Sequence, residues 1–221
     1  MTHFSDGVRA GRNFANNGTA NQPGVFMSPI NVYDVVPAAL VTNGICAQQT
    51  ITGAANAVIN GSLASGGVAT LDVPRNVIVD AAGAATAVLT VYGTDAYGIT
   101  MSEAITLNGA TAVAGKKAFK TITRIASSAT ATDIFVGTGD VFGLPIRANS
   151  RNYVQTAWNG AFVTTGTFVA AVTTSPATTT TGDVRGTYAV PDAADASKRL
   201  TLWVFVADDD TQTGLYGVTQ A

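Results

Sequence analysis

Apolar and polar residues alternate along the middle of the chain, as they do in a strand with one buried face. Side chains alternate from Val88 to Tyr92, and this run stops at Gly93-Thr94-Asp95. A second alternating run extends from Thr100 to Leu107. Two β-prone runs joined by a short link that contains Gly and Asp are typical of an antiparallel hairpin. The pattern therefore predicts two paired strands here.

Residues 119–125 alternate in the same way and predict a further strand. A lone hairpin is too small to be stable in water, whereas three or four strands form a sheet that can bury one face. We therefore expect an all-β fold, an antiparallel β-sandwich of immunoglobulin-like or jelly-roll-like type, with its core in residues 68–125.

A second group of strands is expected in residues 133–206. Residues 133–143 (DIFVGTGDVFG) favour a strand, a turn and a strand, and residues 153–172 favour two strands around Asn159-Gly160, a dipeptide common in tight hairpins. Residues 173–182 are rich in Thr and favour a surface loop or an extended edge. Residues 185–190 and 200–206 are expected to form the last pair of strands.

The N-terminal part of the chain has weaker patterns. We expect an extended N-terminal arm in residues 1–30 and the β-sandwich domain in residues 31–221. Pro37 interrupts an apolar run and argues against a central strand or a helix interior there. Residues 38–49 favour one or two turns of helix, and residues 58–61 favour a strand followed by a turn.

The arm carries isolated large residues between Gly and Asn. Phe4, Phe14 and Phe26, together with Arg9 and Arg12, have the chemistry of anchors for a neighbouring chain. A disordered terminus is the alternative, and the sequence leaves both open. At the other end, Leu215 and Tyr216 are expected to pack against the rest of the molecule.

The composition of the chain argues against some classes of partner. Hydrophobic residues make up 47% of the 221 residues and charged residues only 12%, against about 25% in an average protein. No apolar run approaches the ~20 residues that span a bilayer, so we expect no membrane partner. The net charge of -2 gives no electrostatic footprint for nucleic acid. A surface with so few charges suits a protein that packs against other proteins.

The chain has too few cysteine and histidine residues for an internal disulfide or a zinc site. The single Cys46 cannot form an internal disulfide, and residues 1–20 lack the basic and apolar stretches of a secretory signal, so synthesis and folding in a cytoplasm are expected. His3 and Cys46 lie far apart, and Asp208-Asp209-Asp210 lacks the spacing of a calcium loop. We expect no metal and no other cofactor.

The sequence predicts that the protein is not an enzyme. A catalytic triad would need His3, which lies in the arm. A glycosidase needs two carboxylates in different environments, and Glu103 is the only Glu, with a cross-strand ion pair to nearby lysines as the plainer interpretation. Phe142, Trp158 and Trp203 could form a platform that stacks on a sugar, although aromatic residues on alternating strands more often belong to the core.

Several segments resemble a β-sandwich segment that recurs in structural proteins of tailed bacteriophages. They are VPRNVIVDAAG, VLTVYGTDAYGITMSEAITLNG and KKAFKTITRI, followed by GDVFGLP and TTGDVRGTY, and together they span residues 68–190. The shared pattern is a Pro-Arg strand, a Val-x-Gly-Thr-Asp-x-x-Gly hairpin with Ser-Glu, and a Lys-x-Phe-Lys strand.

This resemblance implies a structural virion protein, namely a capsid decoration or cement protein that stabilises the phage head. The implied partners are the major capsid protein and further copies of the chain in a trimer or dimer, and the implied location is the capsid exterior. The alternative is a tail, fibre or receptor-binding module that recognises a host surface glycan through Trp158 or Trp203.

Overall fold

Antiparallel strands form nearly all of the regular structure. The structure is a computed structural model and describes residues 30–172 and 178–205. Within these residues the only helical element is a single 3-10 turn, η1 (Arg151–Tyr153). The predicted all-β, antiparallel and sandwich-like fold is confirmed.

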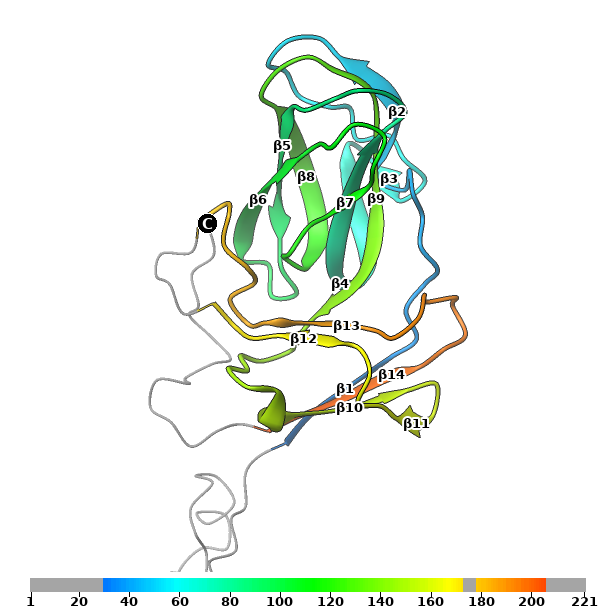
Figure 1. Ribbon diagram of the computed structural model, residues 1–221, viewed down its shortest axis with the longest axis vertical. Coiled ribbons are helices and arrows are strands. Elements are labelled where there is room, and N and C mark those ends of the chain that lie inside the picture. The colour runs from blue at the N-terminus through cyan, green and yellow to red at the C-terminus, as the bar shows by residue number, and fades with distance from the viewer. Residues whose placement is uncertain (1–29, 173–177, 206–221) are drawn as a thin grey trace, which may run out of the picture.

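The strands form a large curled sheet above a smaller flat one (Figure 1). The large sheet has ten strands. Its main path runs β12 (Thr167–Val169), β13 (Thr187–Ala189), β9 (Ala131–Gly143), β4 (Val68–Ala81), β8 (Phe119–Ser127), β5 (Val88–Thr94) and β6 (Thr100–Thr106). Its other members are β2 (Cys46–Ile51), which pairs with β9, and β3 (Ala64–Ser65) and β7 (Val113–Ala114), which pair with β4.

The smaller sheet has four strands and is called the lower sheet below. Its order is β1 (Ile30–Val35), β14 (Leu200–Phe205), β10 (Val154–Trp158) and β11 (Ala161–Phe162). Figure 1 shows it lying beneath β12 and β13, which form the lower edge of the large sheet. The first and last described strands, β1 and β14, are therefore neighbours.

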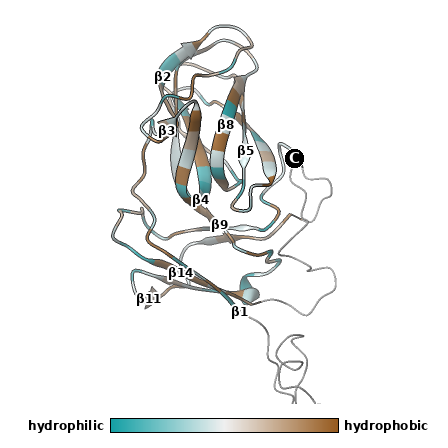
Figure 2. Cartoon of the chain, turned by 180° about the vertical axis from the view of Figure 1, so that it is seen from behind, coloured by the Kyte–Doolittle hydropathy of each residue, from teal (hydrophilic) through white to brown (hydrophobic). Residues whose placement is uncertain are grey.

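Two hydrophobic cores correspond to these two parts. The upper core lies inside the curled sheet, where the alternation seen in the sequence turns Leu89, Val91, Ile122 and Ile125 inward. The lower core lies between the lower sheet and β9 with β13, and contains Phe142, Tyr188, Trp158, Leu200 and Leu202. Apolar positions interspersed with paler ones along β8 and β4 are visible in Figure 2.

The two hairpins predicted from local sequence patterns are confirmed. β5 and β6 pair from Val88–Thr106 to Thr94–Thr100, and β8 adds to the other side of β5. β10 and β11 pair around Asn159 and Gly160, both with positive φ as a tight turn requires.

The predicted turn at residues 137–140 is wrong, because β9 runs without a break from Ala131 to Gly143. Both glycines of the segment lie where other groups approach the strand. A Cβ on Gly137 would collide with the backbone of Val41 and Thr42, and a Cβ on Gly139 would collide with the side chain of Asn76. Glycine is needed here for close approach rather than for a turn.

Three further predictions of local structure are wrong. Residues 38–49 form a loop and then β2 instead of helical turns, and residues 58–61 contain no strand. The strands of residues 185–190 and 200–206 do not pair, because β13 pairs with β9 and β12 while β14 pairs with β1 and β10. The expected positions of Leu215 and Tyr216, and of the arm before Ile30, lie outside the described residues.

Candidate functional site

The lower sheet has two very different faces. Its inner face carries Leu200, Leu202, Val204 and Trp158, all buried in the lower core. Because side chains alternate along a strand, the residues between them point away from the core. This outward side, called the outer face below, is formed by Ile30, Val32, Asp34, Gln155, Ala157, Phe162, Thr201, Trp203 and Phe205.

The outer face is largely apolar although solvent reaches it. Ile30 is 50% exposed, Val32 is 59% exposed and Phe162 is 71% exposed. The ring of Phe162 lies against that of Trp203, with 5.5 Å between their centroids. Contiguous apolar side chains on a surface mark places where another molecule binds.

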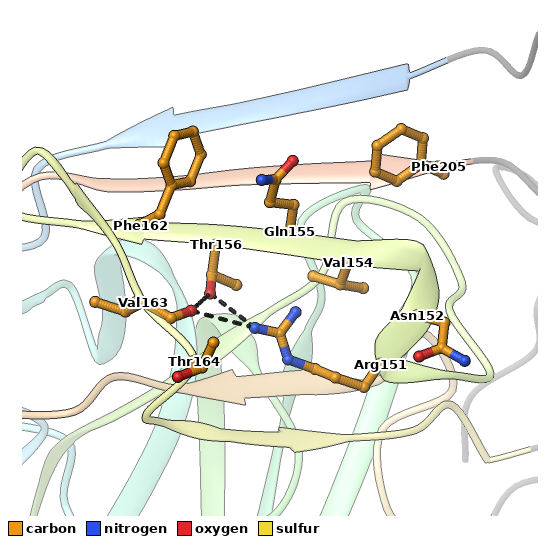
Figure 3. Close-up of a pocket in the computed structure, with 9 residues that line it drawn as sticks. All are labelled: Arg151, Asn152, Val154, Gln155, Thr156, Phe162, Val163, Thr164 and Phe205. Atoms are coloured by element: carbon orange, nitrogen blue, oxygen red, sulfur yellow. Dashed lines mark hydrogen bonds between the residues drawn. The ribbon is translucent and has the colours of Figure 1, made fainter.

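A cleft of about 340 Å³ adjoins this face at the start of β10. In Figure 3, Phe162, Gln155 and Phe205 lie on one side of β10, and Arg151 lies on the other. Arg151 donates from Nη2 to Thr156 Oγ1 at 2.9 Å, and Thr156 Oγ1 donates to the carbonyl of Val163 at 2.7 Å. These contacts fix the wall of the cleft.

In the described part of the chain, β1 forms one edge of the lower sheet. Among the strands that the structure describes, β1 pairs only with β14. In an antiparallel strand every second residue directs its N–H and C=O groups away from its partner, so β1 presents backbone groups that can accept another strand. Asp34 accepts from Arg199 at 2.6 Å and from Thr201 at 3.0 Å, contacts that lie on the β14 side of the strand.

A first buried charged cluster surrounds Arg75 of β4. Its guanidinium donates to Asp140 at 2.7 Å, to the carbonyl of Gly139 at 2.6 Å and to that of Ala38 at 2.9 Å. Burial raises the pKa of Asp140, and the N–H of Ala194 and the charge of Arg75 oppose that rise. The donors of Arg75 are thus used to join β4, β9 and the loop after β1.

A second buried charged cluster lies where the two cores meet. Glu103 accepts from the backbone N–H groups of Lys116 at 2.5 Å and Lys117 at 3.1 Å, and the side chain of Lys117 donates to the carbonyl of Thr178 at 2.8 Å. Burial raises the pKa of Glu103 and lowers that of Lys117. The expected pairing of Glu103 with lysines is therefore a contact with their backbone.

Asp183 and Arg185 complete this second cluster. Asp183 accepts from the N–H of Ala118 at 3.0 Å and from that of Arg185 at 2.9 Å, and burial raises the pKa of Asp183. Arg185 forms a buried ion pair with Asp95, which also accepts from the N–H of Tyr97 at 2.8 Å. The cluster ties the turn between β5 and β6 to the segment before β13, a role in holding the fold together.

The structure describes only some of the candidate residues that the sequence analysis named. Phe4, Arg9, Arg12, Phe14 and Phe26 lie outside the described residues. Phe142 and Trp158 are buried, so the expectation that they belong to the core is confirmed. Trp203 is half-buried and lies on the outer face.

The sequence reasoning missed the outer face. The signal was available, because β1 (INVYDV) and β14 (LTLWVF) carry large apolar residues at both odd and even positions. Apolar residues on both faces of a strand are the pattern of a sheet that is covered on both faces. Among the described residues, the lower core covers the inner face, and the outer face stays accessible to solvent.

The described residues contain no helix long and apolar enough to cross a membrane. Over the same ranges, no group of three or more His, Cys, Asp or Glu side chains is placed to hold a metal ion. Comparisons with protein-family models, with curated proteins and with solved structures find no match to this chain.

Proposed function

We propose that this chain is a structural virion protein, a decoration or cement protein that binds the outside of the major capsid lattice of a tailed bacteriophage. The observation that carries the proposal is the outer face of the lower sheet, where apolar side chains lie beside an open strand edge. An assembly protein needs such a surface, since the centre of a lasting interface is depleted in charge and rich in aromatic residues.

Three further properties support an assembly role. Charged residues are only 12% of the chain, which suits extensive contact with other proteins. The two buried charged clusters link segments far apart in the sequence and make the scaffold rigid, so that it loses little conformational entropy on binding. Closed symmetric assembly would also satisfy the open edge of β1.

Capsid binding tests the proposal. Purified full-length chain is added to expanded capsids that lack it, and bound protein is measured after sedimentation. We expect saturable binding, and we expect Phe162→Asp to weaken it by roughly tenfold or more, because a charge on the outer face disrupts the contacts by which copies assemble on the capsid.

Val58→Asp is the matched control, because Val58 is 62% exposed and lies outside the lower sheet. It should bind like the unmodified chain. A chain that fails to bind capsids, or that binds equally well with Phe162→Asp, would contradict the proposal.

A second candidate function is recognition of a host glycan by a tail or fibre module. The exposed ring of Phe162 and the half-buried ring of Trp203, beside a cleft that Gln155 and Asn152 also line, favour it because sugars stack on aromatic rings between polar groups. Trp158 is buried and is excluded from this role. Binding on a glycan array that Trp203→Ala abolishes would support this function, and an array without binding would reject it.

A further inference from the structure

The outer face of the lower sheet lies at the point where two long segments join the described fold. Ile30 and Phe205 are paired across β1 and β14, so residues 1–29 and residues 206–221 are both attached at this end of the sheet. Each segment is long enough to cover the face, because an extended chain spans about 3.3 Å per residue.

The two segments differ in how well their side chains fit an apolar face. Residues 206–221 carry Asp208, Asp209 and Asp210 within five residues of β14, and burying carboxylates against apolar side chains is unfavourable. Residues 1–29 instead carry Val25, Phe26 and Met27 close to β1, besides the apolar Phe4 and Phe14 further away. The N-terminal segment therefore has the composition that fits the face.

The way in which the chain enters β1 favours a segment from a neighbouring copy over the chain's own segment. The exposed Val32, the Phe162–Trp203 ring pair and the rest of the face lie along β1 beyond Ile30. Pro29 precedes Ile30, and the residue before a proline is restricted to extended backbone. Because Ser28 is restricted in this way, we expect that Val25, Phe26 and Met27 cannot turn back onto their own face within the two residues that separate Met27 from Ile30.

Charge supports the N-terminal segment as the occupant, and it acts equally on the chain's own segment and on a neighbour's because Ile30 and Phe205 are paired. Arg9 and Arg12 outnumber Asp6 in residues 1–29, so this segment is basic, whereas Asp208–Asp210 make the start of the C-terminal segment acidic. An incoming basic segment that reaches the receiving copy at Phe205 meets these carboxylates. Attraction between opposite charges then favours its docking at that end of the face.

We propose that residues 1–29 of a neighbouring copy occupy the outer face of the lower sheet. Their large apolar side chains lie against Val32, Phe162 and Trp203, and their backbone adds a strand to the open edge of β1, as in other cases of strand addition. This inference rests on the proposed function, because exchange of N-terminal segments is what links copies into an assembly.

Photo-crosslinking in a mixture of labelled chains tests the inference. Full-length chain with Phe162→benzoylphenylalanine is made at natural isotope abundance and mixed, after unfolding and refolding together, with an equal amount of unmodified chain labelled with nitrogen-15. The mixture is irradiated, digested and analysed by mass spectrometry. We expect crosslinks from position 162 to peptides of residues 1–29, with heavy and light peptides in equal amounts.

Two classes of result would overturn the inference. Crosslinks only to light peptides of residues 1–29 would show that each chain covers its own face. Crosslinks to residues 206–221, to the outer face of a second copy, or to no peptide would show that residues 1–29 are not the occupant. Val58→benzoylphenylalanine is the matched control and should give no crosslink to residues 1–29.

The capsid-binding assay distinguishes a failure of this inference from a failure of the proposed function. If position 162 crosslinks to heavy residues 1–29 but the chain does not bind capsids, the exchange stands and the cement function fails. If the chain binds capsids without that crosslink, the cement function stands and this inference fails.

Discussion

Arg75 shows how one residue can organise several segments. It is almost completely buried, at 1% exposure, yet its donors reach two carbonyls and the carboxylates of Asp72 and Asp140. In the sequence, Arg75 is visible only as part of a Pro-Arg dipeptide inside an apolar run, which does not reveal partners more than 60 residues away, such as Asp140. Such contacts depend on the pairing of β4 with β9, which is a property of the whole fold.

We predict that Arg75→Met lowers the free energy of unfolding by about 3 kcal/mol, because the change leaves carbonyls and the partly buried carboxylate of Asp140 without their donor. Urea unfolding followed by far-UV circular dichroism measures this. Arg199→Met is the matched control, since the pair of Arg199 with Asp34 is exposed on both sides and such pairs contribute about 0–1 kcal/mol. Equal losses in the two variants would contradict the role assigned to Arg75.

At the scale of elements, the sequence predicted what depends on neighbouring residues. Alternation and a Gly- or Asn-containing link identify the β5–β6 and β10–β11 hairpins, because both strands and their turn lie within one short segment. The sequence-based prediction failed at β9, because glycine can indicate either a turn or a close approach of other groups to a strand. It also failed at β13 and β14, because their partners are set by packing between distant strands. The outer face could be recognised from the two-sided apolar pattern of β1 and β14, but its occupant could not.

Gly93 is a second place where close approach explains a glycine. It lies in β5 at an irregularity in the pairing with β8, and a Cβ there would collide with the backbone carbonyl of Thr121. We predict that Gly93→Ala lowers the free energy of unfolding by about 2 kcal/mol or more, because the strand would have to move away from its neighbour.

Thermal and urea unfolding of Gly83→Ala give the comparison for Gly93. A Cβ on Gly83 meets no atom within 4 Å, so this control should change stability by less than about 0.5 kcal/mol. Unchanged stability of Gly93→Ala would show that β5 and β8 separate there without cost.

On the scale of the whole molecule, two cores are held together by charged contacts at their junction. The ion pair between Asp95 and Arg185 connects the hairpin of the upper core to the segment that leads into β13 of the lower part. Both tryptophans belong to the lower sheet, whereas most strands belong to the large one. Tryptophan fluorescence and far-UV circular dichroism therefore report on different parts of the fold.

We predict that the two signals change together during urea unfolding of the unmodified chain, and that Arg185→Met separates them, with fluorescence changing at lower urea. Removing one partner of a buried ion pair leaves an uncompensated charge and costs about 3–5 kcal/mol, and here the loss falls on the junction. Lys198→Met, which removes a more exposed ion pair within the lower part, should keep the two transitions together. Coincident transitions in Arg185→Met would show that the junction does not depend on this pair.

The pairing of β1 with β14 also constrains the order of events during synthesis. Asp34 and Arg199 are 165 positions apart, so a ribosome that adds about 5–20 residues per second completes the later strand roughly 10–30 s after the earlier one. The curled sheet, apart from β12 and β13, can form from residues already made, while Ile30 to Val35 wait without a partner. During that interval nascent chains on one messenger are close together, and an unpaired leading strand is available for contact between them before any copy is complete.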